Sequence, residues 1–442
     1  MFQHGNLRTL VLDETDRLLE MGFRRDIQDI LTCLNNDDNS PPEFASSVKK
    51  IEQGIRQTLL FSATLTQDIM DVVDLAITGE SKNKNYEMVD CVHEDDPATH
   101  TNTGTRQSYI VLPSERFWTG SMELILQLMT ATKKKKHKVI VFFEMTRLAE
   151  LYSKFLSLRL GHTSGVWELH GKMHQRERTV VTRRFRNAPH GVLLTSDVSA
   201  RGVDYPDVSH VIQVGAPQNR ETYIHRLGRT GRAGREGEGV LILSPHEQGF
   251  VDDELVGLDV VTDDSLQQGL LTSQTKKLGI IRKDLQNELG MLKHDLKTGR
   301  DQTGMAESLT LTYHSLVSYY FQTRRHPRRR RGKVTGEADP TAAPPSEATT
   351  MAIINQLVED FGLPELPSIG FKHAKSMGIE HLASQLNIRK DWEDQNWDIH
   401  DSSGGESSER NDHGDFDDWF GLSSAPRNLS DITPLRDAWG KS

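Results

Sequence analysis

The sequence predicts an α/β protein with parallel sheets, followed by a helical extension and a disordered acidic tail. Short apolar runs alternate with segments of helical periodicity, a pattern typical of βαβ units whose strands pair in parallel. Between about residues 252 and 322 the periodicity is helical and no further strand is predicted. From residue 391 onward Asp, Ser and Gly dominate, a composition typical of disorder.

Composition excludes several other classes of protein. The 442 residues allow two or three domains, and 36% hydrophobic with 26% charged residues suits a globular protein with some disordered sequence. No apolar run approaches the ~18 residues of a membrane span, so we expect no contact with membranes. Only Cys33 and Cys91 are present, which excludes a disulfide framework and favours a reducing, intracellular compartment.

The negative charge of the chain belongs to its end. The net charge is −10, but the segment 391–442 carries 13 acidic and 4 basic residues and so accounts for −9. The first 390 residues are close to neutral. The overall acidity therefore does not argue against nucleic-acid binding by the folded part.

Two apolar runs define the first expected domain. Residues 10–12 predict a strand that is buried on both faces, and residues 58–61 predict a second such strand. Residues 35–54 are polar and predict an inserted loop, and residues 93–105 predict a loop before a strand at 107–111. Apolar residues at helical spacing predict a helix between the two strands: Phe23, Ile27, Ile30, Leu31 and Leu34.

A second series of strands predicts a second α/β domain, with the boundary near residues 112–119. Thr146 predicts the N-cap of a helix that follows the first of these strands. The predicted strands are residues 139–143, 191–194, 210–214 and 239–243. We therefore expect five segments: domains at 1–115 and 116–251, a helical extension at 252–322, a basic run with linker and short helix at 323–390, and the tail at 391–442.

Acidic residues follow the first predicted strand. Asp13, Glu14 and Asp16 stand at its carboxyl end, where parallel sheets bind ligands. One carboxylate there can hold Mg²⁺ through water while its neighbour orients the water that attacks a γ-phosphate. By itself this cluster is equally typical of a solvated loop.

Hydroxyl residues follow the second predicted strand. Ser62 and Thr64 stand at its carboxyl end and can hydrogen-bond Asp16, which would connect a nucleotide site to a neighbouring domain. The alternative is that both are ordinary helix caps.

The second domain carries the more specific pattern. The run 196–204 follows one strand, and the run 225–232 (His-Arg-Leu-Gly-Arg-Thr-Gly-Arg) follows another. Arginines three residues apart on one helical face can both reach a polyphosphate, for which guanidinium groups are well suited. The combination of His, Gly and spaced Arg argues against a merely solvated helix.

In their order and spacing these segments resemble motifs II to VI of DEAD-box RNA helicases, over roughly the first 250 residues. The resemblance implies two RecA-like domains, the first of them incomplete here. The helical extension, with 313–320 and 362–378, resembles the mitochondrial intron-splicing subgroup. The segments that carry the family resemblance are 11–16, 62–64, 139–146, 170–172 with Gln175 and Arg178, 197–204, and 225–232.

The resemblance implies an ATP-dependent RNA helicase with ATP and Mg²⁺ as cofactors. Asp13 would contact Mg²⁺ through water, and Glu14 would be the catalytic base. Arg229 and Arg232 would be catalytic arginine fingers that also bind nucleotide. The other implied residues are Gly202 and Asp204 for nucleotide, Gln175, Arg178 and Ser196 for the RNA backbone, and Asp16, Ser62, Thr64 and His225 for domain coupling.

Three departures from the family pattern stand out. Thr15 replaces Ala, and Ser196 replaces Thr but keeps the hydroxyl. The third concerns the phosphate-binding loop: only twelve residues precede Asp13, and no Gly-x-x-x-x-Gly-Lys-Ser/Thr occurs anywhere. We therefore expect an N-terminally truncated chain that is inactive alone.

Other readings remain open on the sequence alone. The chain would otherwise be a non-hydrolysing RNA-binding module, whereas a DNA-directed motor fits the motifs poorly. The basic run 324–333 is either a solvated linker or nuclear-type signal, or a tether that adds phosphate contacts. We expect a monomer that contacts RNA independently of base sequence, in the mitochondrial matrix or alternatively in the nucleus or nucleolus.

Overall fold

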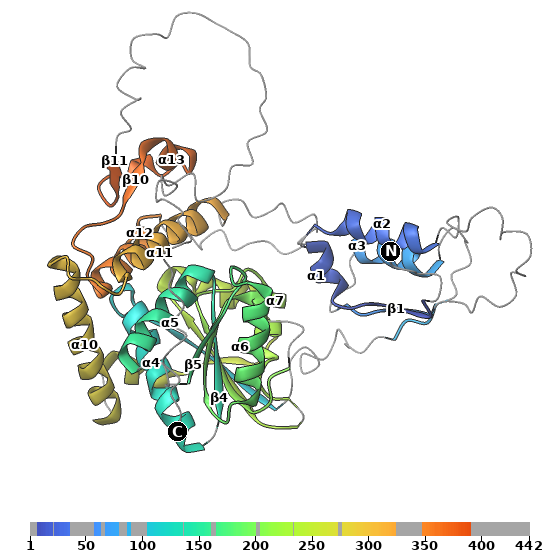
Figure 1. Ribbon diagram of the computed structural model, residues 1–442, viewed down its shortest axis with the longest axis horizontal. Coiled ribbons are helices and arrows are strands. Elements are labelled where there is room, and N and C mark those ends of the chain that lie inside the picture. Colours follow the sequence, from blue (N-terminus) through green and yellow to red (C-terminus); the bar gives the residue numbers. More distant parts are fainter. Residues whose placement is uncertain are drawn as a thin grey trace, which may run out of the picture. The chain divides into compact units, whose positions relative to one another are not determined.

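The computed structural model describes two compact units, residues 1–100 and 101–442 (Figure 1). The residues that it describes are 7–20, 22–35, 57–62, 67–78, 86–89, 104–135, 137–160, 165–199, 204–232, 234–272, 276–323 and 347–389. The inserted loop expected within 35–54, the basic run and the acidic tail lie outside these ranges, apart from residue 35. The linker expected at 340–350 is described from residue 347 onward, where it is helical. Among the described residues, no helix has the length and hydrophobicity that crossing a membrane requires.

The first unit is a small α/β layer. Strands β1 (Thr9–Leu12) and β2 (Gln57–Leu60) pair in parallel, with Leu10 opposite Thr58. Ile27, Leu31, Val72 and Ala76 form the buried core beside these strands. The helices are α1 (Thr15–Glu20), α2 (Arg24–Asn35), α3 (Gln67–Val73) and the π-helical turn η1 (Asp74–Thr78).

The expectation that the first strand is buried on both faces is wrong for the described structure. Val11 is 51% exposed and Phe61 is 54% exposed, whereas Leu10, Leu12 and Leu60 pack against the core. Successive side chains of a strand point to opposite faces of the sheet. Among the described residues of this unit, the helices cover one face only.

The second unit is built on a parallel sheet of seven strands. Their order is β5-β6-β4-β7-β8-β3-β9, and every pairing between neighbours is parallel. The strands are β3 (Thr105–Val111), β4 (Lys138–Phe143), β5 (Val166–Leu169), β6 (Gly191–Thr195), β7 (Val208–Val214), β8 (Gly237–Leu243) and β9 (Val260–Thr262).

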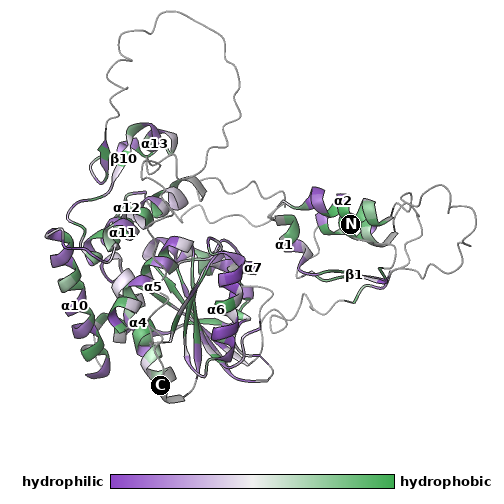
Figure 2. Ribbon diagram, viewed as in Figure 1, coloured by the Kyte–Doolittle hydropathy of each residue, from purple (hydrophilic) through white to green (hydrophobic). Residues whose placement is uncertain are grey.

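Helices cover both faces of this sheet (Figures 1 and 2). The central strand β4 is therefore buried throughout, as its Val, Ile and Phe residues predict. Val139 and Val141 lie in one apolar cluster, and Ile140 and Phe142 in another. The helices α4 (Ser114–Lys135) and α5 (Thr146–Leu160) contribute to the first cluster, and α6 (Gln175–Asn187) to the second. Beside it, α7 (Arg220–Leu227) packs its Tyr223 and Leu227 on β8.

The predicted helical extension is present and packs on α4 and α5. Trp118 of α4 donates its indole N–H to the Ile353 carbonyl at 2.8 Å, which joins α12 to the same core. The elements after β8 are η4 (Pro245–Glu247), α8 (Gly249–Glu254), α9 (Asp264–Thr272), α10 (Lys276–Lys297), α11 (Met305–Ser318), the π-helical turn η5 (Tyr319–Thr323), α12 (Glu347–Phe361), β10 (Ser368–Gly370), α13 (Phe371–Ser376), η6 (Glu380–Leu382) and β11 (Asn387–Arg389).

Three expected boundaries differ from the structure. The domain boundary falls after residue 100, not at 112–119, because β3 pairs along its length with β8. The region 252–322 contains one strand, since the three residues of β9 pair with β3. Residues 347–389 are more than a short helical segment: α12 joins the main core, and β10 pairs in parallel with β11.

Close packing at Gly237 generates a stability prediction. A Cβ at this position would lie 2.4 Å from the Thr230 hydroxyl oxygen and 2.5 Å from the Gly231 nitrogen. Gly237→Ala should therefore lower the free energy of unfolding by about 1–3 kcal/mol. Urea unfolding followed by tryptophan fluorescence measures the change.

The matched control is Gly290→Ala in α10. A Cβ there meets nothing within 4 Å, and replacing a helical Gly by Ala gains up to about 1 kcal/mol. Equal unfolding midpoints for the two variants would contradict the packing at Gly237.

Candidate nucleotide and RNA site

The turn after β1 holds the predicted acidic residues in a constrained geometry. Glu14 has φ of 50°, a left-handed conformation that non-glycine residues rarely adopt. Its backbone N–H donates to the Asp13 carboxylate at 3.0 Å. Strained backbone of this kind concentrates at functional sites. The turn therefore fixes two adjacent carboxyl groups at the carboxyl end of a parallel strand.

Backbone hydrogen bonds join this turn to the end of β2. Thr15 donates its N–H to the Phe61 carbonyl at 3.1 Å, and Phe61 donates to Leu12 at 2.8 Å. Asp16 is 6% exposed beside this junction, and Ser62 follows directly after Phe61. The strand ends thus bring Asp16 and Ser62 to the same edge, and the hydrogen bond between them stays a prediction. Thr64 lies outside the described residues.

In the second unit, three predicted nucleotide residues gather at one place. Arg232 donates to the Asp204 carboxylate at 2.8 Å and to the Gly228 carbonyl at 2.7 Å. The hydrogen bond from Arg232 lowers the pKa of Asp204, and the nearby charge of Arg229 lowers it further. Arg229 is 9% exposed. Gly202 lies outside the described residues.

The prediction that the arginines share a helical face is wrong. Helix α7 ends at Leu227, so Arg229 and Arg232 lie in the turns that follow it. Arg229 donates its N–H to Arg226 at 3.1 Å, and Gly231 has φ of 66°, which directs the chain away from the helix. The two side chains are brought toward Asp204 by this turn instead of by helical spacing. His225 lies within α7 and is half-buried.

The RNA candidates lie close to the arginine turn. Gln175 is exposed at the start of α6, where the His174 N–H donates to Glu177 at 3.2 Å. Arg178 is half-buried on the next turn. Burial raises the pKa of Tyr205, while the positive charges of Arg229 and Arg178 act in the opposite direction. Arg178 and Arg229 therefore lie near the same buried phenol, which places an RNA candidate and a nucleotide candidate together.

Ser196 is positioned by the residue before it. The Thr195 hydroxyl, fully buried at the end of β6, lies 2.5 Å from the Leu169 carbonyl and 2.9 Å from the Ser196 carbonyl. It also lies 2.9 Å from the Ser199 hydroxyl. These contacts join the ends of β5 and β6 at the half-buried Ser196.

A buried ion-pair network, not anticipated from the sequence, supports this region. Arg226 is fully buried and donates to Asp197 at 2.6 Å and to Glu144 at 3.1 Å. Burial alone would lower the pKa of Arg226, but the two carboxylates outweigh it, so the pKa is raised and the group stays charged. The Tyr319 hydroxyl, from the helical extension, also donates to Glu144.

A second tyrosine of the helical extension also donates to a glutamate that follows a strand. The Tyr320 hydroxyl donates to Glu247 at 3.1 Å, and Glu247 also accepts from the Ala216 N–H at 3.1 Å and from the Ser244 hydroxyl at 2.7 Å. The helical extension thus reaches the carboxyl ends of β4, β7 and β8 through two consecutive tyrosines. Arg226 stands three residues before Arg229, and this spacing could have drawn attention to it. No sequence pattern pointed to Asp197 and Glu144 as its partners.

Two family models match separate parts of the chain. The DEAD/DEAH box helicase family model matches residues 2–72, and the Helicase conserved C-terminal domain model matches residues 120–234. DEAD-box ATP-dependent RNA helicase 25 of Oryza sativa subsp. japonica is 35% identical over 308 residues, which cover 68% of this chain and 47% of the relative. ATP-dependent RNA helicase cyt-19, mitochondrial, of Neurospora crassa is 38% identical over 271 residues, 59% of this chain and 40% of the relative.

The fold is shared with solved helicases. The structure of Mss116p bound to ssRNA and AMP-PNP has a TM-score of 0.56 at 21% identity and covers 87% of this chain and 66% of that chain. Mss116 bound to ssRNA and UDP-BeF has a TM-score of 0.58 at 22% identity, with 86% and 66% covered. The chain spans about half the length of the curated relatives that it matches first. Because both helicase domain models match and the similar proteins found are DEAD-box helicases, the chain belongs to the DEAD-box helicase family.

Proposed function

We propose that this chain is the part of an ATP-dependent RNA helicase that extends from motif II to motif VI. In such an enzyme RNA binding and ATP hydrolysis are coupled to local unwinding of duplexes. The observation that carries the proposal is the gathering of Asp204, Arg229 and Arg232 at one place, with Arg178 close by. These groups suit a polyphosphate and an RNA backbone side by side.

In the first unit, Asp13 and Glu14 would serve the nucleotide. Asp13 fits Mg²⁺, because proteins bind this ion through one or two carboxylates, with waters and substrate phosphates completing its shell. When bound, Mg²⁺ neutralises phosphate charge, while Glu14 orients the attacking water as the base. In the strained turn, the Glu14 N–H holds the Asp13 carboxylate at 3.0 Å.

Arg232 would release the Asp204 carboxylate and bind the triphosphate of the nucleotide instead. Its partner Asp204 is 59% exposed and Arg232 itself is 34% exposed, and exposed ion pairs contribute only about 0–1 kcal/mol. A triphosphate can therefore displace Asp204 from Arg232 at low cost. Arg229, almost buried beside it, would supply the second arginine finger.

Coupling between nucleotide and domain closure would pass through Asp16, Ser62, Thr64 and His225. The contacts between the ends of β1 and β2 support this role, because they hold Asp16 and Ser62 at one edge. RNA would bind through Gln175, Arg178 and Ser196 to its backbone. Such contacts read shape and 2′-hydroxyl groups instead of base sequence.

The phosphate-binding loop of such an enzyme is not found in this sequence. We propose that the chain by itself hydrolyses little ATP, since the β- and γ-phosphates lack their backbone cradle. A second candidate function is a non-hydrolysing RNA-binding module. It is favoured by the location of Gln175, Arg178 and Ser196, which all belong to the second unit.

We also propose that the protein acts as a monomer in the mitochondrial matrix. One matched relative is named as mitochondrial, which supports this compartment. A fluorescent fusion of the complete gene product that appears only in the nucleus would overturn the proposal.

The first prediction here concerns hydrolysis by the chain as given. RNA-stimulated release of phosphate from ATP should be at background level, because Glu14 and Arg229 have no phosphate loop to act with. A coupled ATPase assay with single-stranded RNA measures it, with Glu14→Gln as the control. Robust turnover that Glu14→Gln abolishes would overturn the prediction.

A second prediction applies to a longer protein that joins this chain to a phosphate-binding loop. Arg229→Ala or Arg232→Ala should lower kcat on the order of 10³-fold or more, because each removes charge stabilisation from the transferring phosphate. The Kd for ATP should change much less. An unchanged kcat in either variant would remove that residue from the mechanism.

The third prediction tests the RNA contacts in the chain as given. Arg178→Ala should weaken binding to single-stranded RNA, and the slope of log affinity against log salt should become shallower by about 0.7 for one lost phosphate contact. Arg178→Lys is the matched control, since it keeps the charge and should retain most of the salt slope. Fluorescence anisotropy at several salt concentrations separates the two, and identical slopes for wild type and Arg178→Ala would rule out the contact.

A further inference from the structure

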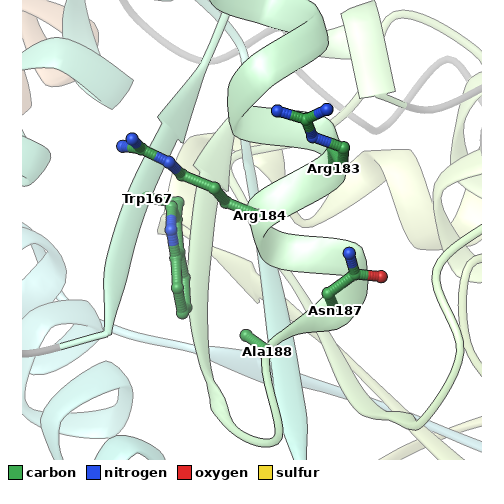
Figure 3. Close-up of a pocket in the computed structure, with 5 residues that line it drawn as sticks. All are labelled: Trp167, Arg183, Arg184, Asn187 and Ala188. Atoms are coloured by element: carbon green, nitrogen blue, oxygen red, sulfur yellow. The ribbon is translucent and has the colours of Figure 1, made fainter.

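A pocket at the C-terminal end of α6 is not used by the proposed helicase function. It has a volume of about 400 Å³ and is lined by Trp167, Arg183, Arg184, Asn187 and Ala188. Figure 3 shows Trp167 on its strand and Arg184 extending from the helix toward it, with Ala188 at the end of the helix. An aromatic face beside two guanidinium groups suits a ligand that is both aromatic and anionic.

The local structure holds this pocket in shape. The Trp167 ring lies 5.4 Å from the buried Phe185 ring. Gly191 makes room for the indole, since a Cβ there would lie 2.2 Å from Trp167. Lys138, almost fully buried, donates to the Arg186 carbonyl at 2.9 Å and so fixes the end of α6. The buried contacts of Phe185, Gly191 and Lys138 thus fix the strand and the helix end on which the exposed pocket side chains stand.

Positive charge continues along α6 beyond the pocket. The helix carries five arginines and one glutamate, and Arg176, Arg183, Arg184 and Arg186 are exposed. Its outer side is hydrophilic (Figure 2). At about 1.5 Å per residue, the pocket lining begins at Arg183, ~12 Å along the helix from Gln175 and ~7.5 Å from Arg178. A ligand in the pocket would therefore lie beside the proposed RNA contacts, in the same positive field.

The tail of the same chain has the complementary chemistry. The segment 391–442 has a net charge of −9 and contains four of the six tryptophans of the chain. Its residues 412–421 read Asp-His-Gly-Asp-Phe-Asp-Asp-Trp-Phe-Gly, in which acidic groups alternate with aromatic rings. We propose that residues 412–421 dock in the α6 pocket, with an aromatic side chain against Trp167 and Asp residues against Arg183 and Arg184.

The chain is long enough for this contact. Asp415 lies 26 residues after Arg389, where β11 ends. For a chain of that length, the random-coil relation gives a root-mean-square span of roughly 28 Å, and full extension gives roughly 90 Å. Tethering of this kind gives effective concentrations up to about the millimolar range, so a weak site is sufficient.

A docked tail would compete with RNA, an effect that rests on the proposed RNA-binding function. A segment of Asp and aromatic residues imitates a single strand of nucleic acid, with carboxylates in place of phosphates and rings in place of bases. It would neutralise part of the positive field of α6 and compete with RNA. The tail would then act as an internal inhibitor that lowers RNA affinity several-fold.

Photocrosslinking in the full chain tests the docking without relying on RNA. Phe416 is replaced by the photoreactive p-benzoyl-phenylalanine, and crosslinked peptides are identified by mass spectrometry after irradiation. We expect crosslinks to the peptides that contain Trp167 or residues 183–188. They should be lost in Arg183→Glu/Arg184→Glu and retained in Arg176→Glu/Arg186→Glu, which has the same change of charge on the same helix outside the pocket.

A second variant keeps the pocket intact. Asp415→Asn/Asp417→Asn/Asp418→Asn should also abolish the crosslinks, so that a folding defect in the pocket variants cannot explain the result. Crosslinks at other sites, or equal yields in both arginine pairs, would overturn the docking. This readout is independent of helicase activity and of RNA binding.

An RNA titration then separates the two possible occupants of the pocket. If the tail docks, neutralising its Asp residues raises the affinity for a uridine decamer several-fold, and Arg183→Glu/Arg184→Glu removes that gain. If the arginine variants weaken RNA binding equally with intact and neutralised tails, the pocket is an RNA site and the proposal fails.

Discussion

The guanidinium of Arg226 is fully buried, and a buried cation costs several kcal/mol unless carboxylates face it closely. Asp197 and Glu144 meet that requirement at 2.6 and 3.1 Å. These three residues come from α7, from the segment after β6 and from the end of β4, so one charge connects three parts of the sheet's carboxyl edge. Losing one partner of such a pair typically costs about 3–5 kcal/mol. Arg229 is joined to the same residue through its backbone N–H, which donates to the Arg226 carbonyl at 3.1 Å.

The network also explains why the helical extension belongs to the functional unit. Tyr319 and Tyr320 are consecutive, yet their hydroxyls donate to Glu144 and Glu247, which follow different strands. The π-helical turn η5 begins at Tyr319, and π-helical turns often occur at functional sites. A displacement of this turn would change the partners of Arg226. The extension is therefore connected to the proposed site by specific polar contacts as well as by apolar packing.

Sequence reasoning predicted the parts of the fold that are governed by local pattern. The buried strand β4 and the helix α5 follow from apolar periodicity, whereas α4 was not predicted. The strand β9 was missed because three residues carry too little periodicity, and the domain boundary was misplaced because the partner of β3 is β8, more than one hundred residues later in the chain. Whether Val11 is exposed depends on which helices cover that face of the sheet. The sequence of one strand does not contain this information.

In the candidate site, too, residues within local motifs were predicted and contacts between distant segments were not. Asp204, Arg229 and Arg232 were named from their motif and lie together, but the turn at Gly231 brings them there, and helical periodicity did not predict it. Arg226, Glu144 and Tyr319 were not named, because a buried ion pair between distant segments leaves no pattern in either segment. The roles of the named residues remain predictions.

The hydrogen bond from Trp118 to Ile353 has a practical consequence for dissecting this protein. Deletion mapping usually places its ends at motif borders, such as residues 119 and 322. A fragment that begins at residue 119 lacks β3, the strand between β8 and β9. A fragment that ends at residue 322 lacks α12, which is part of the core. A shortened piece that failed to bind RNA would then report lost folding. Fragments that begin before Thr105 and continue to Arg389 keep both contacts and allow function to be read separately from stability.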